Sequence, residues 1–255
     1  MFGKGFHSKL EKVFSFSKDR KIYDDPPPPY ILPDEFIKAK IKEDQLAVLR
    51  DYDTVIVLDD SGSMEHLWPQ ARKALSTLAV VASRYDEDGI DIHFLNHGKV
   101  KDRRFKVKGL ISARDVEELF DRVRPEGPTP LGDCLERITE PVLRNLEKGK
   151  PQKKTNYLVI TDGIPTDDAE SSIVQIAERL EKAGAVLSQL GIQLVQIGTN
   201  EEAREYLSAL DNNLKKKHGI RDIVDTEPFY NCEVTAVRLT KLLLGGINRK
   251  VDKSS

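Results

Sequence analysis

Short apolar runs and amphipathic segments alternate along most of this chain. Apolar runs rich in β-branched residues predict buried strands at residues 54–60, 90–96, 155–161 and 191–198. Amphipathic or capped segments predict helices at residues 66–84, 112–123, 131–147, 169–189 and 201–210. Weaker patterns predict an antiparallel edge strand at 103–110, a strand at 220–225 and a helix near 233–245. Since strands that alternate with helices form parallel βαβ units, we expect a Rossmann-like α/β fold: a doubly wound, mostly parallel central sheet with helices on both faces.

The pattern changes near residue 50, which divides the chain. Residues 1–22 carry six basic side chains against two acidic ones, and four consecutive prolines follow at 26–29. Consecutive prolines lock φ and favour extended polyproline II. We therefore expect an N-terminal basic tail with a proline-rich segment over 1–50, one folded domain over 51–247, and a C-terminal tail over 248–255.

Composition excludes several classes of protein. Hydrophobic residues make up 39% and charged residues 32% of the 255 positions, which is typical of a soluble globular chain. The net charge of −2 gives no long-range attraction to nucleic acid, so we expect no nucleic-acid partner. No apolar stretch is long enough to span a bilayer, and the start has no apolar signal core. Cys134 and Cys232 lie in apolar helical patterns without metal-ligand spacing, which fits a reducing compartment. The expected location is the cytoplasm.

Three polar segments follow predicted strands or precede a helix. Asp59, Ser61 and Ser63 sit at alternate positions after the first strand, and an extended turn would aim them to one side. Thr129 lies in a loop bracketed by two prolines, and Asp162 follows the strand at 155–161. In an open parallel sheet, ligands bind outside the carboxyl ends of the strands, so we expect these side chains to meet there.

Carboxylate and hydroxyl oxygens suit a small, hard cation. The five groups predict a Mg²⁺ site, with Mn²⁺ or Ca²⁺ as alternatives. Two carboxylates roughly balance the dication, and waters complete its shell, so one position stays open. An ion in such a near-neutral site can take an external carboxylate as its last ligand. The predicted function is capture of a partner protein's Asp or Glu through the metal.

These residues resemble the metal-ion-dependent adhesion site of the von Willebrand factor type A family. That site reads D-x-S-x-S, then a distant Thr, then a distant Asp, which Asp59, Ser61, Ser63, Thr129 and Asp162 match in order. The resemblance covers residues 51–247 and implies a metal-dependent protein-interaction module, not an enzyme. It also implies direct coordination by the two serines. Thr129 and the two aspartates would bind directly or through water.

Individual residues of these segments also have structural interpretations that need no metal. Asp59, Ser61 and Ser63 taken alone would fit a capped turn, since Asp and Ser favour such positions. Neighbouring carboxylates are expected to be solvated or to cap helices, and Thr161 to hydrogen-bond locally. These carboxylates are Asp60, Asp167 and Asp168. Trp68 fits either the core or an exposed contact near the metal.

Two other functions use the same residues. A Mg²⁺-dependent phosphoryl-transfer enzyme would also place aspartates after a strand, but it needs a general acid and a Lys that grips phosphate. The loop around Thr129 has no Lys, and no Walker motif occurs. In the second alternative the protein is a structural scaffold whose metal only pins loops.

The N-terminal region suggests two further partners. Pro27, Pro28 and Tyr30 match P-P-x-Y, a ligand of WW domains, although a stiff spacer is the favoured interpretation. Apolar and basic residues at near-helical spacing within 1–22 are compatible with peripheral membrane contact. We favour a disordered or docked tail there because Gly3 and Gly5 weaken a helix.

Overall fold

The computed structural model describes residues 46–82, 84–86, 90–97, 104–107, 113–229 and 241–247. The predictions for the basic tail, the proline-rich segment, Ser112, Cys232 and residues 248–255 lie outside the described residues.

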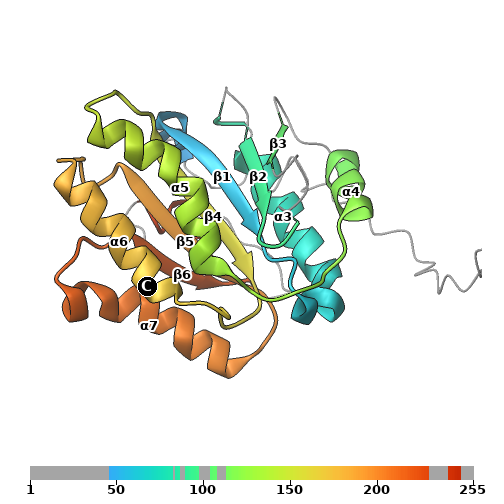
Figure 1. Ribbon diagram of the computed structural model, residues 1–255. Helices are drawn as coiled ribbons and strands as arrows, with labels where there is room; N and C mark the ends of the chain where they lie inside the picture. Colours follow the sequence, from blue (N-terminus) through green and yellow to red (C-terminus); the bar gives the residue numbers. More distant parts are fainter. Residues whose placement is uncertain are drawn as a thin grey trace, which may run out of the picture.

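The described strands form one six-stranded sheet in the order β3-β2-β1-β4-β5-β6 (Figure 1). They are β1 Tyr52–Leu58, β2 Ile90–Phe94, β3 Arg104–Val107, β4 Lys154–Thr161, β5 Leu190–Gln196 and β6 Val224–Pro228. All neighbouring strands pair in parallel except β3, which runs antiparallel to β2 at one edge. The sequence prediction of a mostly parallel sheet with an antiparallel edge strand is therefore confirmed.

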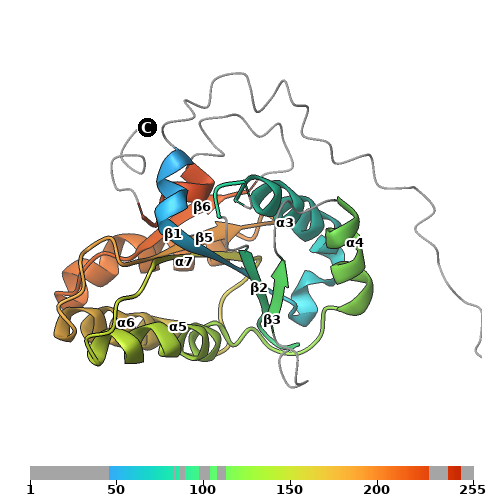
Figure 2. The same ribbon diagram turned by 90° about the horizontal axis from the view of Figure 1, so that it is seen from above.

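Helices cover both faces of this sheet, as a chain with two buried faces requires. The described helical elements are η1 Ala47–Asp51, η2 Gly62–Leu67, α3 Trp68–Ala82, α4 Ala113–Arg122, α5 Leu131–Glu147, α6 Ala169–Lys182 and α7 Glu201–His218. Viewed from above, α3 and α4 lie on one side of the sheet and α5 and α6 on the other (Figure 2). Within the described residues, no helix is long and apolar enough to cross a membrane.

Each face of the sheet has its own hydrophobic core. Alternate residues of β4 divide between the two faces: Leu158 and Ile160 pack with α3, whereas Tyr157 and Val159 pack with α5 and α6. All four side chains are at most 1% exposed. This two-sided burial explains why the strand reads as a continuous apolar run.

Two helix ends differ from the sequence prediction. The helix expected to reach residue 189 ends at Lys182, because Gly184 adopts a left-handed φ of 63°. The helix expected to end near residue 210 continues to His218, since Leu214 is buried against the core. Gly219 then ends it with a φ of 67°, and its N–H donates to the carbonyl of Lys215.

The parallel strands all begin along one side of the sheet, which we call the amino edge. They all end along the opposite side, which we call the carboxyl edge. At the carboxyl edge, β1 and β4 are neighbours, and the chain winds in opposite directions from them, so this is the switch point of the fold. At the amino edge lie both ends of the described region. Leu46 and Leu49 pack in the same core cluster as residues 242–244. The side chain of Asn156, near the start of β4, donates to the carbonyl of Leu243 at 2.8 Å. The carbonyl of Gly246 lies against Gly191, the second residue of β5.

Candidate metal centre

Three oxygen-bearing side chains from two loops lie in a row at the carboxyl edge. The hydroxyls of Ser61 and Ser63 are 3.0 Å apart. The Ser63 hydroxyl donates to Oδ1 of Asp162 at 2.9 Å. Ser61 and Ser63 follow β1, and Asp162 follows β4. Because these strands are neighbours at the switch point, residues far apart in sequence meet there, as the sequence predicted.

Asp59 lies beneath this row and is fully buried. Its Oδ1 accepts the N–H of Ser61 at 2.9 Å, and its Oδ2 accepts the Thr161 hydroxyl at 2.6 Å. Burial raises the pKa of Asp59 to about 6, and the hydrogen bonds from Thr161 and Ser61 oppose that rise. Burial likewise raises the pKa of Asp162, against the hydrogen bond from Ser63. The N–H of Gly163 donates to the Thr161 hydroxyl at 3.3 Å, which is the local hydrogen bond expected for Thr161. The bond that Thr161 itself donates to Asp59, 102 positions away, joins the loops that follow β1 and β4.

The backbone after Asp59 is not the single extended turn that the sequence predicted. Ser61 is extended, with φ −68° and ψ 162°, but a 3-10 turn begins at Gly62. Ser61 is therefore buried at 2% exposure while Ser63 lies at the surface. The two serine hydroxyls still meet, whereas the Asp59 carboxylate is directed toward Thr161.

The loop that carries Thr129 is fixed at the start of α5. The N–H of Thr129 donates to the Thr166 hydroxyl at 3.1 Å, and the N–H of Thr166 donates to the carbonyl of Thr129 at 2.9 Å. Asp167 accepts the N–H groups of Gly132 and Asp133 at 3.1 and 2.8 Å. These contacts cap α5, as sequence reasoning expected of Asp167, and tie the Thr129 loop to the Asp162 loop.

An open cleft with a volume of about 360 Å³ brings four of the five predicted ligands together. Its lining comprises Ser61, Ser63, Gly127, Pro128, Thr129, Asp162, Gly163, Ile164, Thr166 and Asn200. Asp59 lies behind this lining and reaches it through Ser61. None of these lining residues is basic, and the four predicted ligands among them offer hydroxyl and carboxylate oxygens. This donor chemistry fits a hard divalent cation.

The described residues contain no group of three or more His, Cys, Asp or Glu side chains arranged to hold a metal. A centre rich in imidazole or thiolate, as Zn²⁺ prefers, is therefore not formed by this part of the chain. An adhesion-type centre takes three of its five ligands from hydroxyls and would not form such a group. The described geometry is compatible with the predicted ligand set.

Asp60 differs from its sequence prediction as a solvated or capping residue. Its side chain is 0% exposed and accepts the backbone N–H groups of Asn96 and His97 at 2.7 and 2.9 Å. Asp168 does cap a helix: its Oδ1 accepts the N–H of Ser171 at the start of α6. Sequence reasoning missed Asn96, whose only signal was a polar residue directly after a predicted strand.

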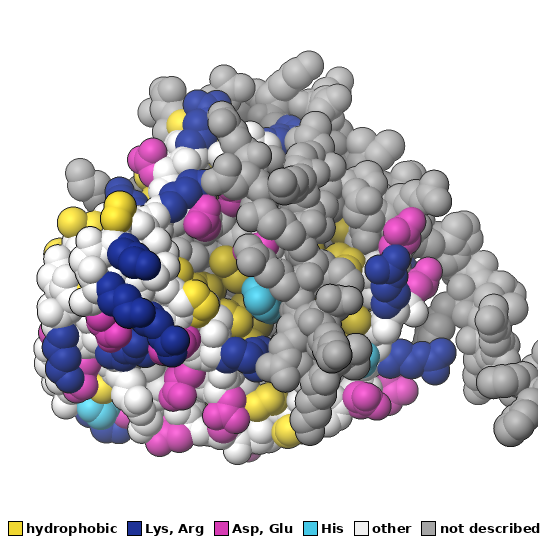
Figure 3. Space-filling model, turned by 45° about the horizontal axis from the view of Figure 1, so that its top comes forward, with side chains coloured by type: hydrophobic (Ala, Val, Ile, Leu, Met, Phe, Trp, Pro, Cys, Tyr) yellow, Lys and Arg dark blue, Asp and Glu magenta, His cyan; other side chains and the backbone are white. Residues whose placement is uncertain are grey.

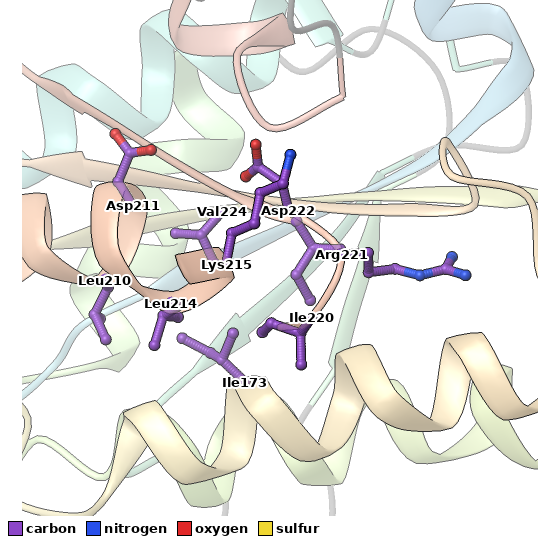
Figure 4. Close-up of a pocket in the computed structure, with 10 residues that line it drawn as sticks. Ile173, Leu210, Asp211, Leu214, Lys215, Ile220, Arg221, Asp222 and Val224 are labelled. Carbon is purple, nitrogen blue, oxygen red and sulfur yellow. The ribbon is translucent and has the colours of Figure 1, made fainter. Parts of the chain in front are cut away.

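A second hollow lies between α6, α7 and the segment before β6 (Figure 4). Its lining includes Ile173, Leu210, Leu214 and Ile220, and it is too small to hold a water molecule. It is a contact region between packed side chains and not a ligand site.

Trp68, which the sequence left undecided between the core and an exposed contact, lies with its ring centre 4.5 Å from that of Phe120 on α4 and is half-buried.

On the face shown in Figure 3, Lys and Arg side chains are interspersed with Asp and Glu. This mixture agrees with the net charge of −2. Among the described residues, the exposed large hydrophobic side chains are Ile164, Val186 and Leu187. Of these, Ile164 lines the cleft.

Residues 53–230 match the von Willebrand factor type A domain family, and this chain belongs to that family. Domains of this family are generally non-enzymatic, metal-dependent protein-interaction modules. Among solved structures, the chain is similar to the crystal structure of the manganese-loaded TRAP protein of Plasmodium vivax. The two share 13% identity over 78% of this chain and 74% of that chain, with a TM-score of 0.45.

Proposed function

We propose that this chain is a Mg²⁺-dependent protein-interaction module that captures an Asp or Glu side chain of a protein partner. One observation carries the proposal. Ser61 and Ser63 are 3.0 Å apart, and Ser63 is 2.9 Å from Asp162, a residue 99 positions along the chain. All three line an open cleft at the carboxyl edge. Thr129 and Asp59 complete the proposed ligand set, and Mn²⁺ or Ca²⁺ are alternative ions.

Each proposed ligand has a distinct task. The bound ion would supply positive charge with one coordination position left for a partner's oxygen. Ser61 and Ser63 would offer hydroxyl oxygens, which leave the ion's charge largely uncompensated. Asp59 and Asp162 would balance the charge of the dication. Asp59 also accepts the backbone N–H of Ser61 at 2.9 Å, which restrains the backbone that carries that hydroxyl.

The two alternative functions have less support from the described residues. A phosphoryl-transfer enzyme would need a cation to grip phosphate, and no Lys or Arg is among the residues that line the cleft. A metal that only pins loops would add little. The Thr161–Asp59 and Ser63–Asp162 hydrogen bonds already join the β1 and β4 loops.

Calorimetric titration with Mg²⁺ tests the proposed ligands. We expect one ion per wild-type chain and no detectable binding by Asp162→Ala or Asp59→Ala. Asp168→Ala is the matched control, because it removes a nearby carboxylate that caps α6 and does not line the cleft. Wild-type protein that binds no ion, or an Asp162→Ala variant that binds normally, would refute the proposed site.

A second experiment separates carboxylate capture from loop pinning. The protein is loaded with Mn²⁺, and water-proton relaxation is followed while a blocked glutamate peptide is added. A carboxylate that enters the metal shell displaces water and lowers the relaxation enhancement. The matching blocked glutamine peptide should have no effect. Equal responses to both peptides would favour a metal that stabilises the fold without taking a partner.

The N-terminal partners are separate proposals that rest on sequence alone. The P-P-x-Y motif formed by Pro27, Pro28 and Tyr30 would recruit a WW-domain protein, and Tyr30→Ala should abolish pulldown by an isolated WW domain.

Peripheral membrane contact by residues 1–22 is the less favoured hypothesis for the basic tail. Equal cosedimentation of full-length protein and a variant without residues 1–22 on anionic liposomes would exclude it. The cytoplasmic location stays a prediction, which imaging of the tagged chain would check.

A further inference from the structure

A buried carboxylate and an amide connect the end of β2 to the loop that carries Thr129. Asp60 is 0% exposed and accepts the N–H of Asn96 at 2.7 Å and that of His97 at 2.9 Å. His97 Nδ1 lies 3.2 Å from the same carboxylate. A fully buried carboxylate is expensive unless hydrogen bonds satisfy it. These contacts therefore fix the β2 loop against the D-x-S-x-S segment.

Asn96 extends this connection to the next loop. Its side-chain nitrogen donates to the carbonyl of Pro128 at 2.6 Å. The preceding residue, Gly127, has a φ of +86°, and a Cβ atom there would lie 3.2 Å from Oδ1 of Asn96. Gly127 is thus packed directly against the Asn96 side chain. Pro128 is the neighbour of Thr129, so the hydrogen bond holds the backbone one residue before a proposed ligand.

The backbone of the D-x-S-x-S segment also forms hydrogen bonds with the loop that carries Thr129. The carbonyl of Asp60 accepts the N–H of Glu126 at 2.7 Å, and the N–H of Gly62 donates to the carbonyl of Gly127 at 3.0 Å. Residues 126, 127 and 128 are therefore each hydrogen-bonded to the segment 60–62 or to Asn96. Thr129 itself has its own contacts with Thr166 on the far side.

We propose that Asp60 and Asn96 are positioning residues of the metal site, which set the place of the Thr129 hydroxyl relative to Ser61 and Ser63. This inference rests on the proposed metal function. Neither residue lines the cleft, and both act through the Gly127–Pro128 backbone. Partners that orient ligands in this way typically change metal affinity by about 10- to 100-fold.

The test is a double-mutant cycle between Asn96 and Thr129, read by Mg²⁺ calorimetry. We expect Asn96→Ala to weaken Mg²⁺ binding roughly tenfold. Because Asn96 acts through Thr129, the same change should have little effect when Thr129→Ala is already present. Asn212→Ala is the matched control: its side-chain nitrogen donates to the carbonyl of Ser208 on the exposed face of α7, and neither residue lines the cleft.

A metal-free measurement tests the positioning by itself. In EDTA, the backbone amide resonances of Thr129 and Thr166 should shift in Asn96→Ala and not in Asn212→Ala. If Asn96→Ala fails to fold, Asn96→Asp serves instead. It keeps the shape but faces a carboxylate toward Asp60 and the Pro128 carbonyl. The same losses are expected from it.

The outcomes separate the two proposals. Wild-type protein that binds no Mg²⁺ would refute the metal function, and the metal role of Asn96 with it. Wild-type protein that binds Mg²⁺, with equal losses from Asn96→Ala in both backgrounds, would refute positioning through Thr129 and leave the metal function intact. Unchanged Mg²⁺ affinity and unchanged Thr129 resonances in Asn96→Ala would also refute positioning through Thr129 and leave the metal function intact.

Discussion

The hydrogen bond from Thr161 to Asp59 gives a quantitative test of the buried carboxylate. Thr161→Val keeps the side chain's shape and removes the hydroxyl that donates to Asp59 Oδ2 at 2.6 Å. Both residues are at most 1% exposed, so water cannot replace the lost donor readily. A hydrogen bond to a charged group contributes about 1.5–3 kcal/mol, and we expect a loss of about 2 kcal/mol in the free energy of unfolding at pH 8.

The loss should depend on pH in a defined direction. Burial raises the folded-state pKa of Asp59 from 3.8 to about 6, so the metal-free folded state binds more protons than the unfolded state between these values. The contribution of Asp59 to stability is therefore greatest at low pH and falls as the pH rises through about 6. At pH 5 Asp59 is mostly neutral, and the Thr161 hydrogen bond contributes only about 1 kcal/mol.

Urea unfolding in EDTA at pH 5 and pH 8 measures both losses. Thr139→Val is the matched control, because Thr139 is also fully buried but donates to the neutral carbonyl of Leu135. Its loss should be about 1 kcal/mol at either pH. The reasoning fails if Thr161→Val is no more destabilising than Thr139→Val at pH 8, or if its effect is the same at both pH values.

Four further predictions use the same protein. Saturating Mg²⁺ should raise the unfolding free energy by about 2.7 kcal/mol at 100 times Kd, and Asp162→Ala should abolish this gain in thermal unfolding. Asp168→Ala should lower stability by about 1 kcal/mol, with Mg²⁺ affinity unchanged in calorimetry. Gly132→Ala should destabilise by about 1–3 kcal/mol in urea, because its Cβ would lie 2.7 Å from Ser172 Oγ between α5 and α6. Ile164→Ser, at a side chain 41% exposed on the cleft, should weaken binding of a protein partner without changing Mg²⁺ affinity.

Patterns that are local in sequence predicted most of the fold. The predicted ends of β1 and β4 lie within two residues of the observed ends. These strands were recognisable because burial on both faces produces continuous apolar runs. The end of α6 was missed because residues 185–187 continue an apolar pattern. Val186 and Leu187 are instead 58% and 64% exposed in a loop that follows Gly184.

The extension of α7 was hidden by its composition. Residues 215–217 are all lysine, which shows no apolar face, although basic residues suit the last turn of a helix. Gly219 was the available signal for the true end, since glycine commonly terminates a helix in the left-handed conformation.

The meeting of the candidate ligands at one edge was predictable from the sequence, but the contacts that support them were not. Asp59 and Asp162 directly follow two strands, and topology alone brings such positions together. The contacts of Asp60 with Asn96 join residues 36 positions apart through loop geometry, for which no periodicity exists. The role of Asp60 was therefore misjudged from sequence.

The two ends of the described region have a mechanical consequence. Leu46 precedes η1 and β1, and Gly246 lies against Gly191 near the start of β5, so both are at the amino edge, while the cleft lies at the carboxyl edge. A pull between a ligand in the cleft and chain attached at either end would act along the strands. The hydrogen bonds between parallel strands are evenly spaced and slanted, and they join one strand to the next and do not run along the pull. A force along the strands would load many of these hydrogen bonds at once in shear and would not open them one after another. We therefore expect the domain to resist a pull between the cleft and its two ends.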